Sequence, residues 1–187
     1  LGTGSSGLDD GRATAFPAIR QLLPGEYLTV DLDTLEVRVE RYWELRPDPD
    51  AGRLDMPMAA RRFRELLADS IRLRLRSDVP VGSCLSGGLD SSSIVSLARA
   101  QFGPATEYHA FAGRFPGTPA DEGPFIGTVA SAAQATLHEV EPQPEMMLDE
   151  LPAFMWHNEL PVSSASQYAQ WCVFRLARQH GVCLLYT

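Results

Sequence analysis

The sequence predicts an α/β protein, with a parallel sheet flanked by helices and a short antiparallel β-hairpin before it. Residues 79–85 are apolar at almost every position, which favours a strand covered on both faces. Strand-like and helix-like patterns then alternate as far as Thr187, an order typical of parallel sheets. A segment rich in Pro, Gly and Asp at 46–52 separates these patterns from the hairpin and indicates a linker.

The composition is that of an ordinary globular protein, with 44% hydrophobic residues in a chain of 187. Its net charge of −8, with arginine as the only basic residue besides histidine, argues against a nucleic-acid surface. No apolar run is long enough to span a membrane. Cys84, Cys172 and Cys183 suggest neither zinc nor disulfides, so we expect a cytoplasmic location. Because the chain begins at Leu1 without a signal-peptide pattern, we expect its natural start to lie upstream.

The elements before the long apolar run follow from local patterns. Residues 1–15 are rich in Gly, Ser, Thr and Asp and predict a loop. Residues 27–30 and 37–42 alternate like two strands, joined by a connection at 31–36. Residues 59–76 have apolar positions at helical spacing, and the six arginines among them indicate a solvated face rather than a phosphate site.

Beyond residue 100 the patterns predict further strands and helices. We expect strands at 107–113, 137–140 and 181–187, and helices at 125–135, 146–157 and 167–179. His138 falls at a strand end, and no second histidine or metal-type spacing accompanies it. We therefore interpret it as a hydrogen-bonding residue and not as a catalyst.

The turn after the long apolar run is the strongest candidate for a binding site. It reads Ser-Gly-Gly-Leu-Asp-Ser-Ser from Ser86 to Ser92. Glycine can adopt positive φ, and the amides at a helix N-terminus attract phosphate. The mononucleotide and dinucleotide fingerprints are both absent, because the chain has no lysine and no Gly-x-Gly-x-x-Gly spacing. The alternative is a Gly/Ser turn that caps a helix and binds nothing.

This run resembles the pyrophosphate loop of the PP-loop ATP pyrophosphatases. A second resemblance lies in residues that flank the hairpin: Phe16, Ile19, Leu22 or Leu23, Pro24, Gly25, Arg41, Tyr42 and Trp43. They look like the end of the N-terminal nucleophile glutaminase domain of glutamine-dependent asparagine synthetases. The resemblance implies a tail of that domain at 1–46, a linker at 47–57, and the first half of a PP-loop, Rossmann-like ATP-binding domain at 58–187.

The resemblance also implies a set of residues that contact ATP. They are Cys84, Leu85, Ser86, Gly87, Gly88, Asp90, Ser91, Ser92, Gly113 and Thr187. Asp90 is expected to bind Mg²⁺, because a carboxylate beside a polyphosphate needs a cation between them. Cys84 and Gly113 take adenine-contacting positions, where the small size of the cysteine matters more than its thiol. No catalytic residue is expected in this chain, because the family's nucleophilic cysteine lies upstream and its lysine and second metal ligand lie downstream.

The reaction that the resemblance implies consumes ATP, aspartate and ammonia from glutamine, and yields asparagine, AMP and pyrophosphate. This fragment alone is expected to be inactive, and the full-length protein to form a homodimer without nucleic-acid or membrane partners. Three alternatives stay open. A related amidotransferase or β-lactam-forming synthetase could act on another carboxylate, a PP-loop enzyme such as a tRNA thiolase could modify nucleic acid, or the fragment could bind ATP without catalysis.

Overall fold

The computed structural model describes residues 11–103, 106–162 and 164–186. Its chain divides into two compact units between Leu54 and Asp55, a point inside the predicted linker at 47–57. Each unit is described by itself below. No helix among the described residues has both the length and the apolar character of a membrane span.

The first unit contains an antiparallel hairpin of β1 (Glu26–Val30) and β2 (Val37–Arg41), as the alternating patterns predict. The turn before β1 is joined to the chain after β2, because the Gly25 carbonyl accepts hydrogen bonds from the amides of Tyr42 and Trp43. Gly25 has a φ of 77°, and a Cβ there would collide with the Trp43 carbonyl, so only glycine fits. A short 3-10 helix, η1 (Ala51–Arg53), follows.

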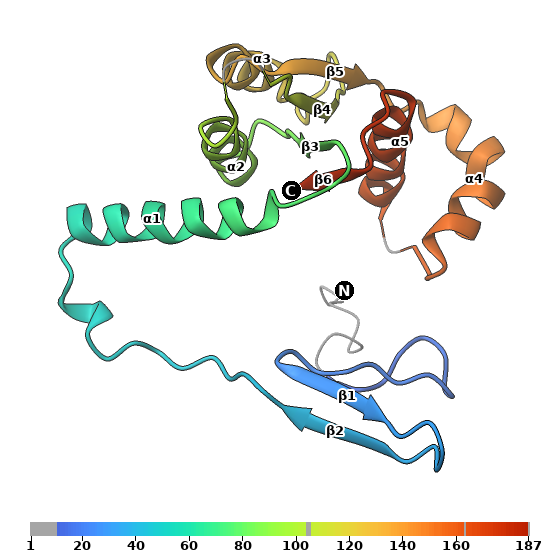
Figure 1. Cartoon of the computed structure of the whole chain (residues 1–187). Coiled ribbons are helices and arrows are strands. Elements are labelled where there is room, and N and C mark those ends of the chain that lie inside the picture. The colour runs from blue at the N-terminus through green and yellow to red at the C-terminus, as the bar shows by residue number, and fades with distance from the viewer. Residues whose placement is uncertain (1–10, 104–105, 163, 187) are drawn as a thin grey trace. The chain divides into compact units, whose positions relative to one another are not determined.

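The second unit is built on four parallel strands in the order β5-β4-β3-β6 (Figure 1). Their bounds are Val81–Cys84 for β3, His109–Gly113 for β4, Thr136–Val140 for β5 and Leu184–Tyr186 for β6. The predicted fold class of a parallel sheet is confirmed. The first buried strand, β3, lies between β4 and β6, as a run that is apolar on both faces requires.

Helices cover both faces of this sheet (Figure 1). On one face α1 (Met56–Arg74), α2 (Leu89–Arg99) and α3 (Gly123–Ala132) supply residues to a core that includes Leu85, Val95 and Ile126. On the other face α5 (Ala165–Gln179) packs Val173 and Ala177 against Phe111, and α4 (Pro144–Asn158) packs against α5. Alternation along β4 sends Ala110 to the first core and Phe111 to the second.

The helices α1, α3, α4 and α5 all begin two or three residues earlier than their apolar spacing predicts, and two of them show a local reason. Asp55 caps α1 by accepting a hydrogen bond from the Met58 amide at 2.8 Å, and Pro57 suits the first turn. The helix α3 begins at Gly123 instead of residue 125, also with proline in its first turn. Gly and Pro weaken a helical pattern in sequence, although proline is well placed at a helix start.

Candidate nucleotide-binding site

The predicted phosphate loop connects β3 to α2 at the carboxyl end of the sheet. The Leu85 amide donates to the Phe111 carbonyl at 2.8 Å, which extends the pairing of β3 with β4 by one residue. Gly87 then turns the chain with a φ of 83°, and Gly88 is the N-cap of α2. The first amides of any helix lack an intrahelical acceptor, and a glycine N-cap supplies no side chain to accept from them. This is the backbone arrangement that favours an anion.

Gly87 cannot be replaced without movement of its surroundings. A Cβ at this position would lie 3.1 Å from the Phe125 Cβ and 3.2 Å from both the Cβ and the carbonyl oxygen of Glu122. The positive φ adds backbone strain for any other residue. The loop is therefore in close contact with the start of α3, a relation that the sequence does not reveal.

The hydroxyl of Ser91 stabilises the conformation of the loop by hydrogen bonds to other loop residues. Its Oγ accepts a hydrogen bond from the Ser86 amide at 3.2 Å, donates to the Gly88 carbonyl at 3.2 Å, and lies 3.0 Å from the Ser86 Oγ. Ser92 lines a separate cavity of about 480 Å³ between α1 and α2, whose lining includes Phe63 of α1 and Leu97 of α2. Contact of the Ser91 and Ser92 hydroxyls with phosphate stays a prediction.

A cavity of about 210 Å³ adjoins the loop. Of the predicted site residues, Cys84, Leu85, Ser86 and Gly113 line it. The remaining lining residues were not predicted: Phe111, Phe115, Ala120, Glu122, Ala169, Gln170 and Val173. The α5 members of that set follow Gly113 in sequence by more than 50 residues, so only the three-dimensional fold identifies them.

The Cys84 side chain contributes a neutral surface to this cavity. Burial raises the pKa of its thiol to about 11, so the thiol stays protonated at neutral pH. Gly113 ends β4 beside it, where a Cβ would come 3.7 Å from the Val173 Cγ2. A cysteine and a glycine at these two strand ends leave room for a flat ligand between the sheet and α5.

Asp90 is the second residue of α2 and its side chain is exposed. The N-cap is Gly88, so Asp90 does not act as the capping residue. Within the described part of the chain its carboxylate has no hydrogen bond or ion pair, which leaves both oxygens available. Oxygen ligands of this kind suit Mg²⁺, which proteins commonly hold with one or two carboxylates and the phosphates of a substrate. The described residues contain no cluster of three side chains that could bind a metal by itself.

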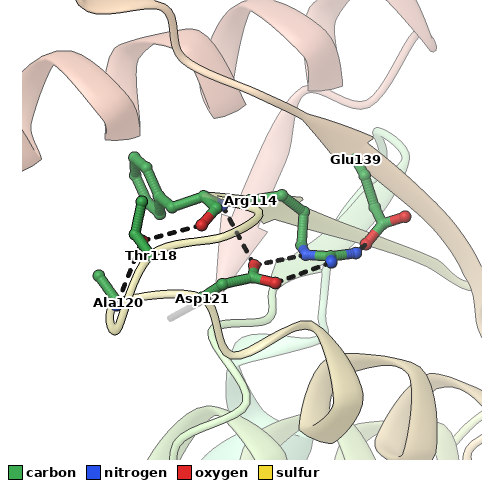
Figure 2. A network of polar contacts seen from close by, with 6 residues as sticks. Arg114, Thr118, Ala120, Asp121 and Glu139 are labelled. Carbon is green, nitrogen blue, oxygen red and sulfur yellow. Dashed lines mark hydrogen bonds and ion pairs between the residues drawn. The ribbon is translucent and has the colours of Figure 1, made fainter.

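Arg114, Asp121 and Glu139 form a charged network that the sequence analysis did not single out (Figure 2). Arg114, directly after β4, forms a two-pronged ion pair with Asp121, with its Nε and Nη2 at 2.8 and 3.0 Å from the carboxylate oxygens. Its Nη1 lies 2.6 Å from a carboxylate oxygen of Glu139 in β5. The Arg114 guanidinium and the amides of Phe115 and Gly123 hold the pKa of Asp121 down to about 2. An arginine after a strand, followed by an Asp-Glu pair before a helix, was the available signal.

The interpretation of His138 as a hydrogen-bonding residue is confirmed, but the expectation that no second histidine accompanies it is wrong. Its ring lies 3.8 Å from the ring of His180 between centroids, and its Nε2 is 3.0 Å from the Nδ1 of His109. Burial and the two neighbouring imidazoles lower the pKa of His138. The register of β4 with β5 brings Phe111 opposite His138 and so gathers these residues on the face that α5 covers. Strand register depends on the tertiary fold, so the sequence alone does not show that these histidines lie together.

The structure thus brings most of the predicted residues to one end of the sheet, around the loop and its cavity. Thr187 lies outside the described residues. The chain is therefore an α/β protein in which a helix without a side-chain cap follows the central strand. This arrangement is a candidate phosphate-binding turn.

Comparison with known proteins gives the family. The family model for asparagine synthase matches residues 62–185. The chain therefore belongs to the asparagine synthase family, and the predicted resemblance is confirmed at that level. A protein of Methanocaldococcus jannaschii, named as a glutamine-hydrolysing asparagine synthetase, is 33% identical over 159 residues, which cover 84% of this chain and 30% of that protein.

Two further relatives differ in kind. The protein named amidase chry2 of Gibberella zeae is 25% identical over 188 residues, which cover 93% of this chain and 28% of that protein. An NH3-dependent NAD synthetase from Campylobacter jejuni superposes with a TM-score of 0.44 at 15% identity, over 66% of this chain and 54% of its own. That structural likeness is too weak to support any conclusion. The chain spans less than a third of the length of the two relatives matched by sequence.

Proposed function

We propose that this chain forms the nucleotide-binding part of an ATP-dependent amidotransferase, which adenylates the side-chain carboxylate of aspartate and aminates it with ammonia from glutamine. The products are asparagine, AMP and pyrophosphate. One observation carries the proposal: the uncapped N-terminus of α2 adjoins a cavity at the carboxyl end of the central strand. Family membership supports the class of reaction.

In this proposal the loop binds the β- and γ-phosphates of ATP. The amides of Gly87 and Gly88 and those of the first turn of α2 donate to phosphate oxygens, and the helix dipole adds to the attraction. Ser91 keeps the loop in this conformation through its contacts with Ser86 and Gly88. As the bond between the α-phosphorus and the oxygen that bridges it to the β-phosphorus breaks, negative charge grows on the departing pyrophosphate. Fixed amides stabilise that charge without any reorganisation.

Asp90 is the proposed Mg²⁺ ligand, at the first turn of the same helix. Mg²⁺ bound there would neutralise phosphate charge and keep the carboxylate and the triphosphate from repelling each other. The adenine ring is proposed to lie in the cavity beside Cys84, Gly113 and Val173. The protonated thiol of Cys84 offers a small apolar surface to it.

Residues 1–46, which belong to the first unit, are proposed to be the tail of a glutaminase domain. Support comes from the hydrogen bonds that join Gly25 to Tyr42 and Trp43, because they connect the two parts of the pattern on which that resemblance rests. Homodimerisation of the complete enzyme and a cytoplasmic location stay predictions.

A second candidate function is the amidation of a different carboxylate. It is kept as a candidate because the similarity to the protein named amidase chry2, over 93% of this chain, shows that related sequences are not all named as asparagine synthetases. In this proposal the phosphate loop and the adenine cavity bind only ATP, so they would serve both reactions equally. A nucleic-acid-modifying enzyme gains no support from the family match.

The decisive experiment is made in the complete enzyme, of which this chain is proposed to be a part. Pyrophosphate release from ATP is measured against Mg²⁺ concentration for the wild type, Asp90→Asn and Asp78→Asn. Asp78 is an equally exposed carboxylate before the other end of β3, so its variant controls for the loss of charge. We expect Asp90→Asn to lower the rate about a hundredfold or more, with glutamine hydrolysis intact. Near-normal release from Asp90→Asn at ordinary Mg²⁺ would defeat the assignment.

A further inference from the structure

Arg114 joins three elements at the carboxyl end of the sheet (Figure 2). Its amide donates to the Val140 carbonyl at 2.8 Å, and its guanidinium binds Glu139 of β5 and Asp121 before α3. Asp121 also accepts a hydrogen bond from the Phe115 amide at 3.1 Å. The side chains of Arg114 and Asp121 are only 22% and 15% exposed, so water competes little for this pair.

The same guanidinium lies directly on the first turn of α3. A Cβ on Gly123 would lie 2.2 Å from the guanidinium carbon of Arg114, so any other residue there would displace the guanidinium from its present position. The place where α3 begins is therefore fixed by Arg114 and Asp121 together.

That first turn is also what Gly87 touches. Glu122, the N-cap of α3, and Phe125 stand 3.1 to 3.2 Å from the point where a Cβ of Gly87 would be. A shift of α3 by a few tenths of an ångström would press on the phosphate loop or leave it unsupported. Arg114 is thus linked to Gly87 in steps: it binds Asp121, Asp121 is followed by Glu122, and Glu122 contacts Gly87.

We infer that Arg114, Asp121 and Glu139 are positioning residues, which hold the first turn of α3 against Gly87 and so fix the direction of the loop amides toward the β- and γ-phosphates. This inference rests on the proposed function, and it deepens that function by naming what orients the loop.

Arg114 is poorly suited to bind phosphate directly, because its Nε, Nη1 and Nη2 atoms all face carboxylate oxygens. The two readings predict opposite effects for Asp121→Asn. If Arg114 bound phosphate, removal of the competing carboxylate charge would strengthen ATP binding. If the network positions the loop, the same change weakens ATP binding.

The test compares the affinities of the complete enzyme for ATP and AMP, measured by equilibrium binding. AMP occupies the adenine cavity without β- or γ-phosphates, so the ratio of the two affinities reports on the loop alone. We expect Asp121→Asn and Gly123→Ala each to lower the ATP-to-AMP ratio about tenfold, and to lower kcat for pyrophosphate release. General loss of folding would weaken both ligands by the same factor and leave the ratio unchanged.

Thr118→Val is the matched control. Its hydroxyl bonds to Phe115 and Ala120 in the same connection but does not touch Arg114 or Asp121 (Figure 2). This variant is expected to keep the ratio within about twofold of the wild type. Should Asp121→Asn fail to fold, Glu139→Gln on the exposed side of the network gives a milder version of the same test, with a smaller fall in the ratio.

The outcomes separate the inference from the proposed function. A wild type that binds ATP no better than AMP would overturn the proposed function, and the inference with it. A wild type that prefers ATP, with Asp121→Asn and Gly123→Ala that keep or increase this preference, would overturn the inference alone.

Discussion

Cys84 shows how one residue is defined by its place in the fold. Its side chain lies at the end of the central strand, lines the candidate adenine cavity and packs against the second core. Burial makes the thiol less reactive than usual, because it raises the thiol pKa to about 11 and so disfavours the thiolate. The residue therefore acts as a small apolar group.

This account predicts selective alkylation. At pH 8 iodoacetamide should modify exposed Cys183 and leave Cys84 almost unreacted, because only a thiolate is an effective nucleophile. Peptide mass spectrometry over time measures the two rates. Equal rates at the two cysteines would show that the Cys84 thiol ionises readily and that its environment has been misjudged.

Asp121 gives a prediction about pH. Its folded-state pKa of about 2 lies below that of an unfolded aspartate, so the unfolded chain binds more protons between about pH 2 and 4. Stability from this carboxylate is complete above that window and disappears as the pH falls through it. Thermal unfolding should show Asp121→Asn less stable than the wild type at pH 6, with the difference vanishing near pH 2. A difference that persisted at pH 2 would assign the loss to something other than the charge.

At the scale of elements, the junction between β3 and α2 depends on its neighbour α3. The loop has the correct residues for a phosphate turn, but its position is set by the contact of Gly87 with Glu122 and Phe125. The proposed phosphate-binding element is therefore positioned by a contact with a neighbouring helix.

Gly87→Ala tests this junction. The change forces a positive φ on alanine and places its Cβ against α3, so we expect a loss of about 1–3 kcal/mol in stability and much weaker ATP binding. Gly127→Ala in α3 is the matched control, because nothing lies within 4 Å of its Cβ position and alanine favours a helix. Urea unfolding measures both. A Gly87→Ala protein as stable as the Gly127→Ala protein would argue against the close contact.

The elements themselves could be predicted well, and their contacts could not. The apolar run before Ser86 gave the central parallel strand, because a strand covered on both faces leaves a clear local pattern. The family resemblance implied that Cys84 and Gly113 share one site, and in the structure both line the same cavity. The Arg114 network and the gathering of His109, His138 and His180 depend on register and on packing between distant segments, which no local pattern encodes.

At the scale of the whole molecule, the chain consists of two compact units with exposed residues on either side of the division. The hairpin of the first unit pairs only with itself among the described residues. Both its strands are largely exposed, so its edges are open to further pairing. This is what a piece of a larger sheet would show.

Limited proteolysis tests the division. Trypsin should cut first between Arg53 and Leu54, because the backbone there is exposed and lies at the unit boundary. Arg46 should resist, since Pro47 follows it. Peptide mapping after brief digestion shows the order of cuts. Early cleavage inside the parallel sheet, with Arg53 intact, would contradict two separate units.

The central claim is that the loop holds ATP for attack at its α-phosphorus. The complete enzyme is supplied with aspartate carrying ¹⁸O in its side-chain carboxylate, together with ATP, Mg²⁺ and glutamine. Attack at the α-phosphorus joins a labelled oxygen to AMP, and ammonia then displaces AMP from the acyl carbon. Mass spectrometry should therefore find one ¹⁸O in AMP and none in pyrophosphate. Labelled inorganic phosphate with ADP as the other product would show attack at the γ-phosphorus and contradict the account.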